Sequence, residues 1–347
     1  MGTVKLAVFG LNQGAKIARD AVAHPEVELV AVAGFGQQAE DVAQELSVKL
    51  YADYKELLQT EELDAVAIAL PNGLHVEAVE ASLAAGLKNI LLEKPIASTV
   101  EEAEHIIEVC KEAQATLLIG HHRRSSPRYL FLRNLVESGR LGDIVGLQSS
   151  FAIAKPYAYF DVAWRITKGG GPLLINAIHD FDDLNYVTGM KPVRVYAAAR
   201  NSIRNNEVED SVSVIVEYEE GATATYFVSD GTPGPWSYDL AACENLSYGL
   251  CDDENSLRIF GTKGSFGFPH MDLYYYDEGH YGWNEELKKE HFDLEINDPM
   301  AAELDHFVDL CTGRETVPRC TGEDALNTLR VSCAVLESAA TRQPVDL

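Results

Sequence analysis

The chain has 347 residues, of which 46% are hydrophobic, and a formal net charge of −26. This length favours two domains over a single core, and the excess of acidic residues argues against nucleic acid as a partner, because nucleic-acid binding needs basic patches to replace counterions. No apolar run approaches the roughly 20 residues of a membrane helix, the first residues lack the order of a signal peptide, and six scattered cysteines are typical of reduced thiols, so we expect a cytoplasmic protein without a membrane partner.

Short apolar strands alternate with helical patterns over the first third of the chain. Strands are predicted at residues 5–9, 28–33, 49–51, 63–70, 89–92 and 116–120. The run 63–70 is apolar throughout, which is typical of a strand buried on both faces. The repeated strand–helix units predict an α/β fold with a doubly wound parallel sheet over residues 1–122.

A glycine turn at residues 10–15 follows the first strand and opens a helix. Gly10 fits a tight first turn, whereas Asn12 stands where a second glycine usually lets the backbone approach a pyrophosphate. The turn is either a degraded dinucleotide fingerprint or an ordinary strand-to-helix turn. At the end of the second strand, Gly34 stands near the place of the carboxylate that would hold the adenosine ribose, so this loop does not decide between NAD and NADP.

Lys94 follows the strand at residues 89–92, where open parallel sheets place their ligands. Pro95 biases Lys94 toward an extended backbone. The lysine is either a solvated side chain or a proton carrier whose pKa is lowered by burial or by a neighbour. Asn72 and His75 lie at the carboxyl end of the neighbouring strand at 63–70.

From residue 142 the pattern changes to strands in meander order. They are predicted at residues 144–151, 193–199, 211–217, 223–229, 257–260 and 265–268. The order predicts a second, α+β domain over residues 123–347 with a large, mostly antiparallel open sheet. The basic run at residues 121–124 precedes it, and it is either a solvated hinge or a contact to a pyrophosphate, an anionic substrate or a polyhydroxyl substrate.

A helix predicted at residues 172–187 carries a polar stripe. Asn176, His179 and Asp183 recur at spacings of three and four, so they share one helix face. Such a stripe must be satisfied either inside the core or by a ligand. His179 has the chemistry to move a hydroxyl proton at neutral pH. No cysteine or second histidine stands at zinc-ligand spacing, so we expect no metal.

The chain resembles the glucose–fructose oxidoreductase / inositol dehydrogenase / MocA (Gfo/Idh/MocA) family over nearly its whole length. The resemblance rests on the glycine turn, on Pro71-Asn72 with His75, on Glu93-Lys94-Pro95, and on the helix carrying His179. It implies a Rossmann domain, NAD(P)-dependent oxidation or reduction of a sugar or cyclitol carbinol, and an open sheet often used for oligomerisation. It also implies that His179 is the base, while Lys94 binds the reacting oxygen and shares the proton.

The resemblance further implies a cofactor site, a cofactor and partners. The cofactor is NAD or NADP, with NAD preferred, and the partners are a small polyhydroxylated substrate and further copies of the chain in a dimer or tetramer. Many members carry an aspartate four residues before the histidine, where this chain has Ile175. The implied cofactor-binding residues are Gly10, Asn12, Gln13, Gly14, Gly34, Pro71, Asn72, His75, Glu93 and Lys94.

Three segments, at residues 120–124, 161–165 and 235–237, resemble dehydrogenases of carboxylated cyclohexadiene diols, and some gut-bacterial oxidases of glycoside sugar moieties look related. Cationic side chains would then bind a substrate carboxylate, and Trp164 or Trp236 would either stack on a ring or serve packing. The implied substrate-binding residues are Arg124, Lys155, Trp164, Arg165, Asn176 and Asp183.

Three functions remain open. The leading hypothesis is a dehydrogenase that oxidises a secondary hydroxyl of a sugar, glycoside sugar moiety or cyclitol to the ketone, or catalyses the reverse. The second is a dehydrogenase of a carboxylated cyclohexadiene diol. The third, from another class, is a non-catalytic dinucleotide-binding sensor or scaffold.

Overall fold

The computed structural model describes residues 2–245, 248–251 and 253–347, and they divide into two units. The first unit runs to Ser125 and includes Pro299–Leu329, and the second comprises Ser126–Asp298 and Arg330–Leu347. The predicted boundary after residue 122 lies near this division, but residues 299–329, predicted to belong to the second domain, pack with the first unit. Within the described residues, no helix is both long and apolar enough to cross a membrane.

The first unit is built on a parallel six-stranded sheet in the order β3-β2-β1-β4-β5-β6, which confirms the predicted doubly wound architecture. Apart from the edge strand β3, the strands are largely buried, because helices cover both faces. Their bounds are β1 (Val4–Phe9), β2 (Val27–Ala33), β3 (Lys49–Tyr51), β4 (Ala65–Ile68), β5 (Asn89–Glu93) and β6 (Thr116–Gly120).

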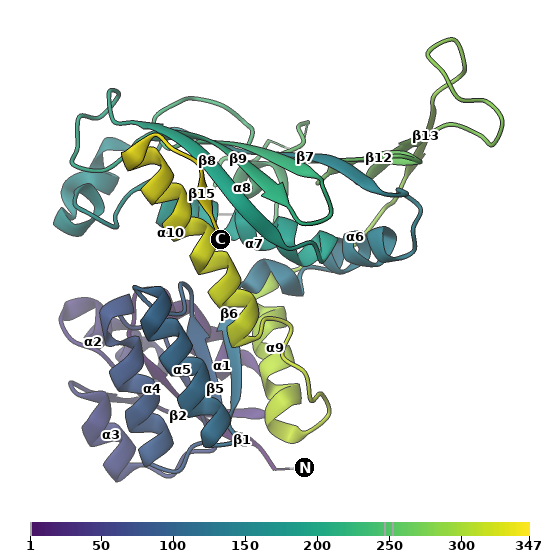
Figure 1. Ribbon diagram of the computed structural model, residues 1–347. Helices are drawn as coiled ribbons and strands as arrows, with labels where there is room; N and C mark the ends of the chain where they lie inside the picture. Colours follow the sequence, from purple (N-terminus) through teal and green to yellow (C-terminus); the bar gives the residue numbers. More distant parts are fainter. Residues whose placement is uncertain (1, 246–247, 252) are drawn as a thin grey trace. The chain divides into compact units, whose positions relative to one another are not determined.

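Helices form a layer on each face of this sheet (Figure 1). One layer contains α1 (Gly14–Ala23), which contacts both α2 (Gln37–Leu46) and α9 (Pro299–Thr312). The other contains α4 (His75–Ala84), which contacts both α3 (Tyr54–Thr60) and α5 (Val100–Glu112). Asp53 caps α3, since its side chain accepts a hydrogen bond from the backbone N–H of Lys55 at the start of that helix. Two short 3₁₀ turns, η1 (Asn72–Leu74) and η2 (His122–Ser125), follow β4 and β6.

The second unit is built on a nine-stranded sheet in the order β14-β13-β12-β11-β7-β10-β9-β8-β15. Neighbouring strands are antiparallel except for the parallel pair β7 and β10, so the predicted mostly antiparallel sheet is confirmed. The bounds are β7 (Ile144–Ala152), β8 (Pro192–Arg200), β9 (Ser211–Tyr218), β10 (Thr223–Ser229), β11 (Leu257–Gly261), β12 (Gly264–Phe268), β13 (Asp272–Tyr275), β14 (Lys288–His291) and β15 (Val345–Asp346).

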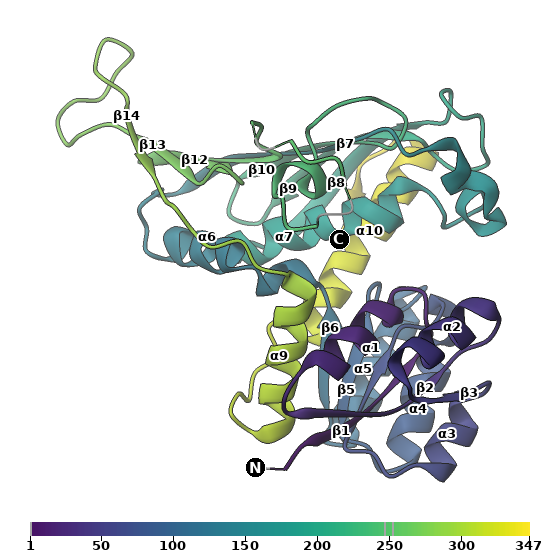
Figure 2. The same ribbon diagram turned by 180° about the vertical axis from the view of Figure 1, so that it is seen from behind.

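One face of this sheet packs on helices and the other is open. Helices α6 (Pro127–Glu137) and α7 (Ile178–Thr188) lie along the packed face (Figure 2), where they join the apolar core of this unit. Burial alternates along β9 and β10, as expected for a strand with one face in the core. The open face carries half-exposed apolar side chains, at Tyr196, Ile215, Phe227 and Phe260.

Shorter elements complete the second unit. The 3₁₀ turns η3 (Tyr157–Asp161) and η4 (Ala163–Ile166) and the π-helical turn η5 (Leu173–Ala177) lead into α7. The predicted helix at 172–187 therefore exists, but its first part is a π-helical turn. Helix α8 (Tyr238–Ala241) is short, and α10 (Gly322–Thr341) carries the chain from the first unit into the second.

Candidate active site and cofactor site

The glycine turn after β1 is shaped by close contact with the end of β4. Gly10 has a φ of +86°, and a Cβ there would overlap the carbonyl oxygen of Ala69. A Cβ at Gly14 would lie 2.9 Å from a Val8 methyl carbon, so α1 begins directly against the sheet. Asn12 and Gln13 are exposed at the tip. The turn thus presents backbone and short polar groups at a helix N-terminus, an arrangement that fits a pyrophosphate.

Neutral groups surround the end of β2, where an adenosine ribose would lie. A Cβ at Gly34 would come within 3.2 Å of the side chains of Leu11 and Ala39, so this position lies against the glycine turn. The amide of Gln38 donates to the Leu11 carbonyl and links the start of α2 to the same turn. Phe35 follows and is 89% exposed, which gives this edge of the site an aromatic surface instead of a carboxylate.

His75 supports the loops at the carboxyl ends of β4 and β5. Its fully buried ring lies between two carbonyl oxygens, with Nε2 2.9 Å from Leu70 O and Nδ1 3.2 Å from Ile96 O. Burial lowers the pKa of His75, and hydrogen bonds to the backbone of Leu70, Ile96 and Pro95 oppose that shift. The imidazole therefore ties the Pro71-Asn72 turn to the segment after Lys94, which is a positioning role for a residue predicted to bind cofactor.

Lys94 is the first residue after β5. In the sheet, β5 is the neighbour of β4, and β4 is the neighbour of β1. The structure therefore places Lys94, the Asn72 turn and the Gly10 turn at the carboxyl ends of three adjacent strands. The backbone N–H of Lys94 donates to the carboxylate of Glu93 at 3.2 Å. Glu93 is buried, and burial raises the pKa of its carboxyl, partly offset by the charge of Lys94.

Helix α9 brings a second buried carboxyl toward Glu93, which sequence reasoning missed. Glu303 is 3% exposed, and burial together with the Glu93 charge raises its pKa well above the ordinary value, while Arg319 opposes the shift. The Nε2 atom of His306, one helical turn on, accepts from the backbone N–H of Arg319. No local sequence pattern predicts this cluster, because Glu303 is more than 200 residues from Glu93 in the chain.

Arg124 of the basic run already has partners in the first unit. Its Nη1 atom donates to the Arg319 carbonyl at 2.8 Å and lies 3.1 Å from a carboxylate oxygen of Asp324. The Arg124 side chain is 4% exposed. Arg124 was predicted to bind a carboxylate of the substrate, but in the structure it pairs with the carboxylate of Asp324. Arg124 thereby links η2 to the segment before α10.

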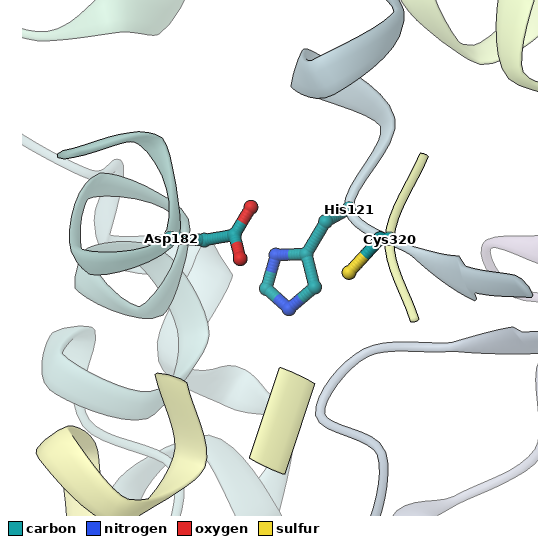
Figure 3. Close-up of side chains that lie close together, drawn as sticks. All are labelled: His121, Asp182 and Cys320. Atoms are coloured by element: carbon teal, nitrogen blue, oxygen red, sulfur yellow. The ribbon is translucent and has the colours of Figure 1, made fainter. Parts of the chain in front are cut away.

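His121, at the end of β6, lies beside Cys320 (Figure 3), with ligand-type atoms of the two within 4.8 Å of one another. The strand and the Cys320 segment are joined by a hydrogen bond from Ile119 N to Cys320 O. His121 and Cys320 both carry atoms that can bind a metal. Zinc takes at least three protein ligands, so these two side chains alone do not make a zinc site. Asp182, the third side chain drawn, projects from α7 of the second unit.

The glycine run before α7 allows close packing at its start. A Cβ at Gly170 would overlap the carbonyl oxygen of Trp164, and a Cβ at Gly171 would overlap the carboxylate of Glu209. That carboxylate accepts from the backbone N–H of Leu173 at 3.1 Å and so caps the π-helical turn. Burial raises the pKa of Glu209.

The polar stripe on this helix is satisfied in different ways along its length. Asn176 accepts a hydrogen bond from the ammonium of Lys155 at 2.7 Å, and Asp183 accepts one from the hydroxyl of Tyr129 at 2.7 Å. His179 lies between them on the chain and is 8% exposed. Asp183 therefore has a structural partner in the core of the second unit, while Asn176 belongs to a polar cluster formed just after β7 and β10.

That cluster is organised around the buried carboxylate of Asp230. Its two oxygens lie 3.6 Å from the ammonium of Lys155 and 3.1 Å from Nε of Arg204. Burial lowers the pKa of Lys155 to about 8, a shift that Asp230 partly offsets. Nearby, Trp164 is 54% exposed, and Arg165 lies against the ring of Tyr159. The two residues predicted to be catalytic belong to different units, Lys94 to the first and His179 to the second.

Comparisons with known proteins cover both units. Residues 4–121 match the family model described as "Oxidoreductase family, NAD-binding Rossmann fold", and residues 129–267 match the model described as "GFO/IDH/MocA C-terminal domain". D-xylose 1-dehydrogenase (NADP(+)) 2 of Haloferax volcanii is 29% identical over 96% of each chain, and inositol 2-dehydrogenase of Rhizobium meliloti is 27% identical over 99% of each. The crystal structure of myo-inositol 2-dehydrogenase from Lactobacillus plantarum shares the fold, with a TM-score of 0.79 and 22% identity over 99% of each chain.

Proposed function

Because this chain belongs to the GFO/IDH/MocA family of NAD(P)-dependent oxidoreductases, we propose that it oxidises a secondary hydroxyl of a sugar, glycoside sugar moiety or cyclitol to the ketone, or catalyses the reverse. The observation that carries the proposal is the position of Lys94 at the carboxyl end of β5, beside the strands that end in the Asn72 and Gly10 turns. The names of the xylose and inositol dehydrogenases among its relatives support this substrate class.

The groups proposed to hold NAD or NADP fit a dinucleotide. When bound, the nicotinamide supplies the hydride acceptor or donor. The turn at Gly10 and Gly14 would hold the pyrophosphate against the N-terminus of α1, because the Gly10 backbone adopts a conformation that a side chain would block. Asn12, Gln13 and Gly34 would line the same groove, and the β4 and β5 loops would border the nicotinamide. Those loop residues are Pro71, Asn72, His75, Glu93 and Lys94.

The proposed proton chemistry uses one residue from each unit. His179 would take the proton of the reacting hydroxyl, since an imidazole moves protons near neutral pH. Lys94 would bind the same oxygen through its ammonium and share the proton. Asn176, which lies three residues before His179, can orient the substrate by hydrogen bonding but cannot take a proton.

Six side chains are proposed to bind or position the substrate, and the structure separates two groups among them. The members of one group bind a carboxylate or a hydroxyl inside the chain and would position other groups. The members of the other group offer an exposed ring, a guanidinium with an unpaired N–H, and a half-buried amide. The first group is Arg124, Asp183 and Lys155, and the second is Trp164, Arg165 and Asn176.

A substrate panel tests the proposed function. Purified protein is mixed with NAD or NADP and with aldoses, glycosides, uronates and cyclitols, and the absorbance of the reduced nicotinamide is followed. We expect turnover with at least one ring alcohol. A protein that binds a dinucleotide but turns over none of the panel would instead be the non-catalytic sensor or scaffold. Native mass spectrometry of protein purified without added cofactor identifies a retained dinucleotide.

We also propose that the chain forms a homo-oligomer through the open face of the nine-stranded sheet. Tyr196 and Ile215 are direct cross-strand neighbours on that face, and Phe227 lies on the next strand. Exposed apolar groups clustered in this way are typical of a protein interface. Light scattering on Phe227→Glu should show a smaller species than the unsubstituted protein, whereas a monomeric unsubstituted protein would contradict the proposal.

A further inference from the structure

Three cations of the second unit lie against the aromatic rings of one short segment, η3. Lys155 Nζ is 4.6 Å from the centroid of the Tyr159 ring, and the guanidinium carbon of Arg165 is 4.0 Å from the same centroid. The guanidinium carbon of Arg204 is 4.0 Å from the Phe160 centroid. Stacking on a ring holds a guanidinium plane in one orientation and makes it ready for a planar ligand.

Only one of these three cations lacks a carboxylate partner among the described residues. Lys155 and Arg204 share the carboxylate of Asp230. The guanidinium of Arg165 makes one hydrogen bond, from Nη1 to the Tyr159 carbonyl at 2.9 Å, and no described carboxylate lies within ion-pair distance of it. Its Nε atom is buried without an acceptor. A buried N–H left in this way costs about 1–3 kcal/mol, so the chain itself leaves this guanidinium incompletely satisfied.

A second donor belongs to the same group of side chains. Lysine can only donate, so the Asn176 atom that faces Lys155 is the amide oxygen, and the amide NH₂ must point elsewhere. The hydrogen bond from Lys155 is the one that the Asn176 side chain makes among the described residues, and the residue is half-buried. The ring of Tyr159 lies against both Lys155, whose ammonium donates to the Asn176 amide, and Arg165, so Tyr159 and Lys155 link the amide to the guanidinium.

We propose, building on the dehydrogenase function above, that Arg165 and Asn176 form a subsite for a carboxylate carried by the ring substrate. A carboxylate offers two coplanar oxygens, which suit the edge of a guanidinium and an amide NH₂. Among the cations that lie against η3, the guanidinium of Arg165 is the one without a carboxylate partner in the described part of the chain, so a substrate acid would supply that partner. The substrate class is thus a uronic acid or a carboxylated cyclitol, in preference to the neutral ring.

Paired ligands that differ by one carboxylate test this subsite without relying on turnover. Calorimetry with the full chain and saturating NAD or NADP compares D-glucuronate with D-glucose, and D-galacturonate with D-galactose. We expect at least one acid to bind about 10-fold or more tighter than its neutral partner. The preference should vanish in Arg165→Gln and remain in Arg133→Gln, whose guanidinium pairs with Glu137 on α6.

A second variant keeps the test valid if Arg165→Gln does not fold. Asn176→Asp keeps the side-chain volume, replaces the NH₂ donor by a carboxylate oxygen, and should lower the affinity for the acid while the affinity for the neutral ring changes less. No preference in either pair, an absence of binding by both acids, or a preference that survives both substitutions would overturn the subsite. Failure of turnover on the whole panel would overturn the dehydrogenase function and leave a measured acid preference standing.

Discussion

Replacing Lys155 by methionine should change how the stability of the second unit depends on pH. Burial lowers the pKa of Lys155 from 10.5 to about 8, so the folded state holds the charged ammonium at a cost. Below about pH 8 both folded and unfolded chains bind the proton, and the shift of about 2.5 pH units corresponds to roughly 3 kcal/mol against folding. Above about pH 8 only the unfolded chain keeps it, so this cost shrinks as the pH rises.

The unsubstituted protein should therefore gain about 2 kcal/mol of unfolding free energy relative to Lys155→Met as the pH rises from about 7 to about 9.5. Other groups that titrate in this range, such as Cys110, are common to both proteins and cancel in the difference. Urea unfolding followed by tryptophan fluorescence reports on the second unit alone, because the three tryptophans of the chain, Trp164, Trp236 and Trp283, all belong to it.

A matched control is Lys191→Met, which removes an exposed lysine of the same unit that lies 3.6 Å from Glu219. Its pH curve should run parallel to that of the unsubstituted protein. If the separation between the unsubstituted protein and Lys155→Met stays constant within about 0.5 kcal/mol across this range, Lys155 is not the buried, depressed ammonium described here.

Three further predictions concern the stability of the two units, at a glycine turn, a buried histidine and a buried hydrogen bond. Gly10→Ala should cost more than about 2 kcal/mol in thermal unfolding and weaken dinucleotide binding, whereas Gly36→Ala, with a φ of +80° but open space around it, should cost about 1 kcal/mol. Burial lowers the pKa of His306 to about 4, so the first unit should lose up to about 3 kcal/mol as the pH falls from about 6.5 to about 4, and circular dichroism of His306→Gln should show a weaker dependence. Tyr129→Phe removes a donor to Asp183 and should cost about 1–2 kcal/mol in tryptophan-monitored unfolding; an unchanged midpoint would contradict the role of that hydrogen bond.

The first unit could be predicted from the sequence because its signals are local. A strand buried on both faces is apolar throughout, as β4 is, and a cap such as Asp53 acts within three residues. Helix α6 went unpredicted although Pro127 stands at its first turn, where proline is favoured, because its apolar residues make only a weak stripe.

Long-range pairing is what the sequence could not supply. The carboxylate that pairs with Arg124 belongs to Asp324, 200 residues away, and the one that pairs with Lys155 belongs to Asp230, the residue after β10. From residue types alone, Arg124, Lys155 and Arg165 are equal candidates for a substrate carboxylate. The fold separates them, since it provides partners for the first two and leaves Arg165 with an unused donor edge. The return of residues 299–329 to the first unit likewise depends on packing across the chain.

The assignment of Lys94 and His179 as the catalytic pair is tested most directly by the turnover number of two variants on a substrate identified from the panel. Lys94→Met and His179→Gln should each lower kcat by about 10²- to 10⁴-fold, with the dinucleotide still bound by His179→Gln. Lys88→Met, at the opposite end of the same strand, and His105→Gln, exposed on α5, should keep full turnover. Full turnover by Lys94→Met and His179→Gln would contradict the proposed chemistry.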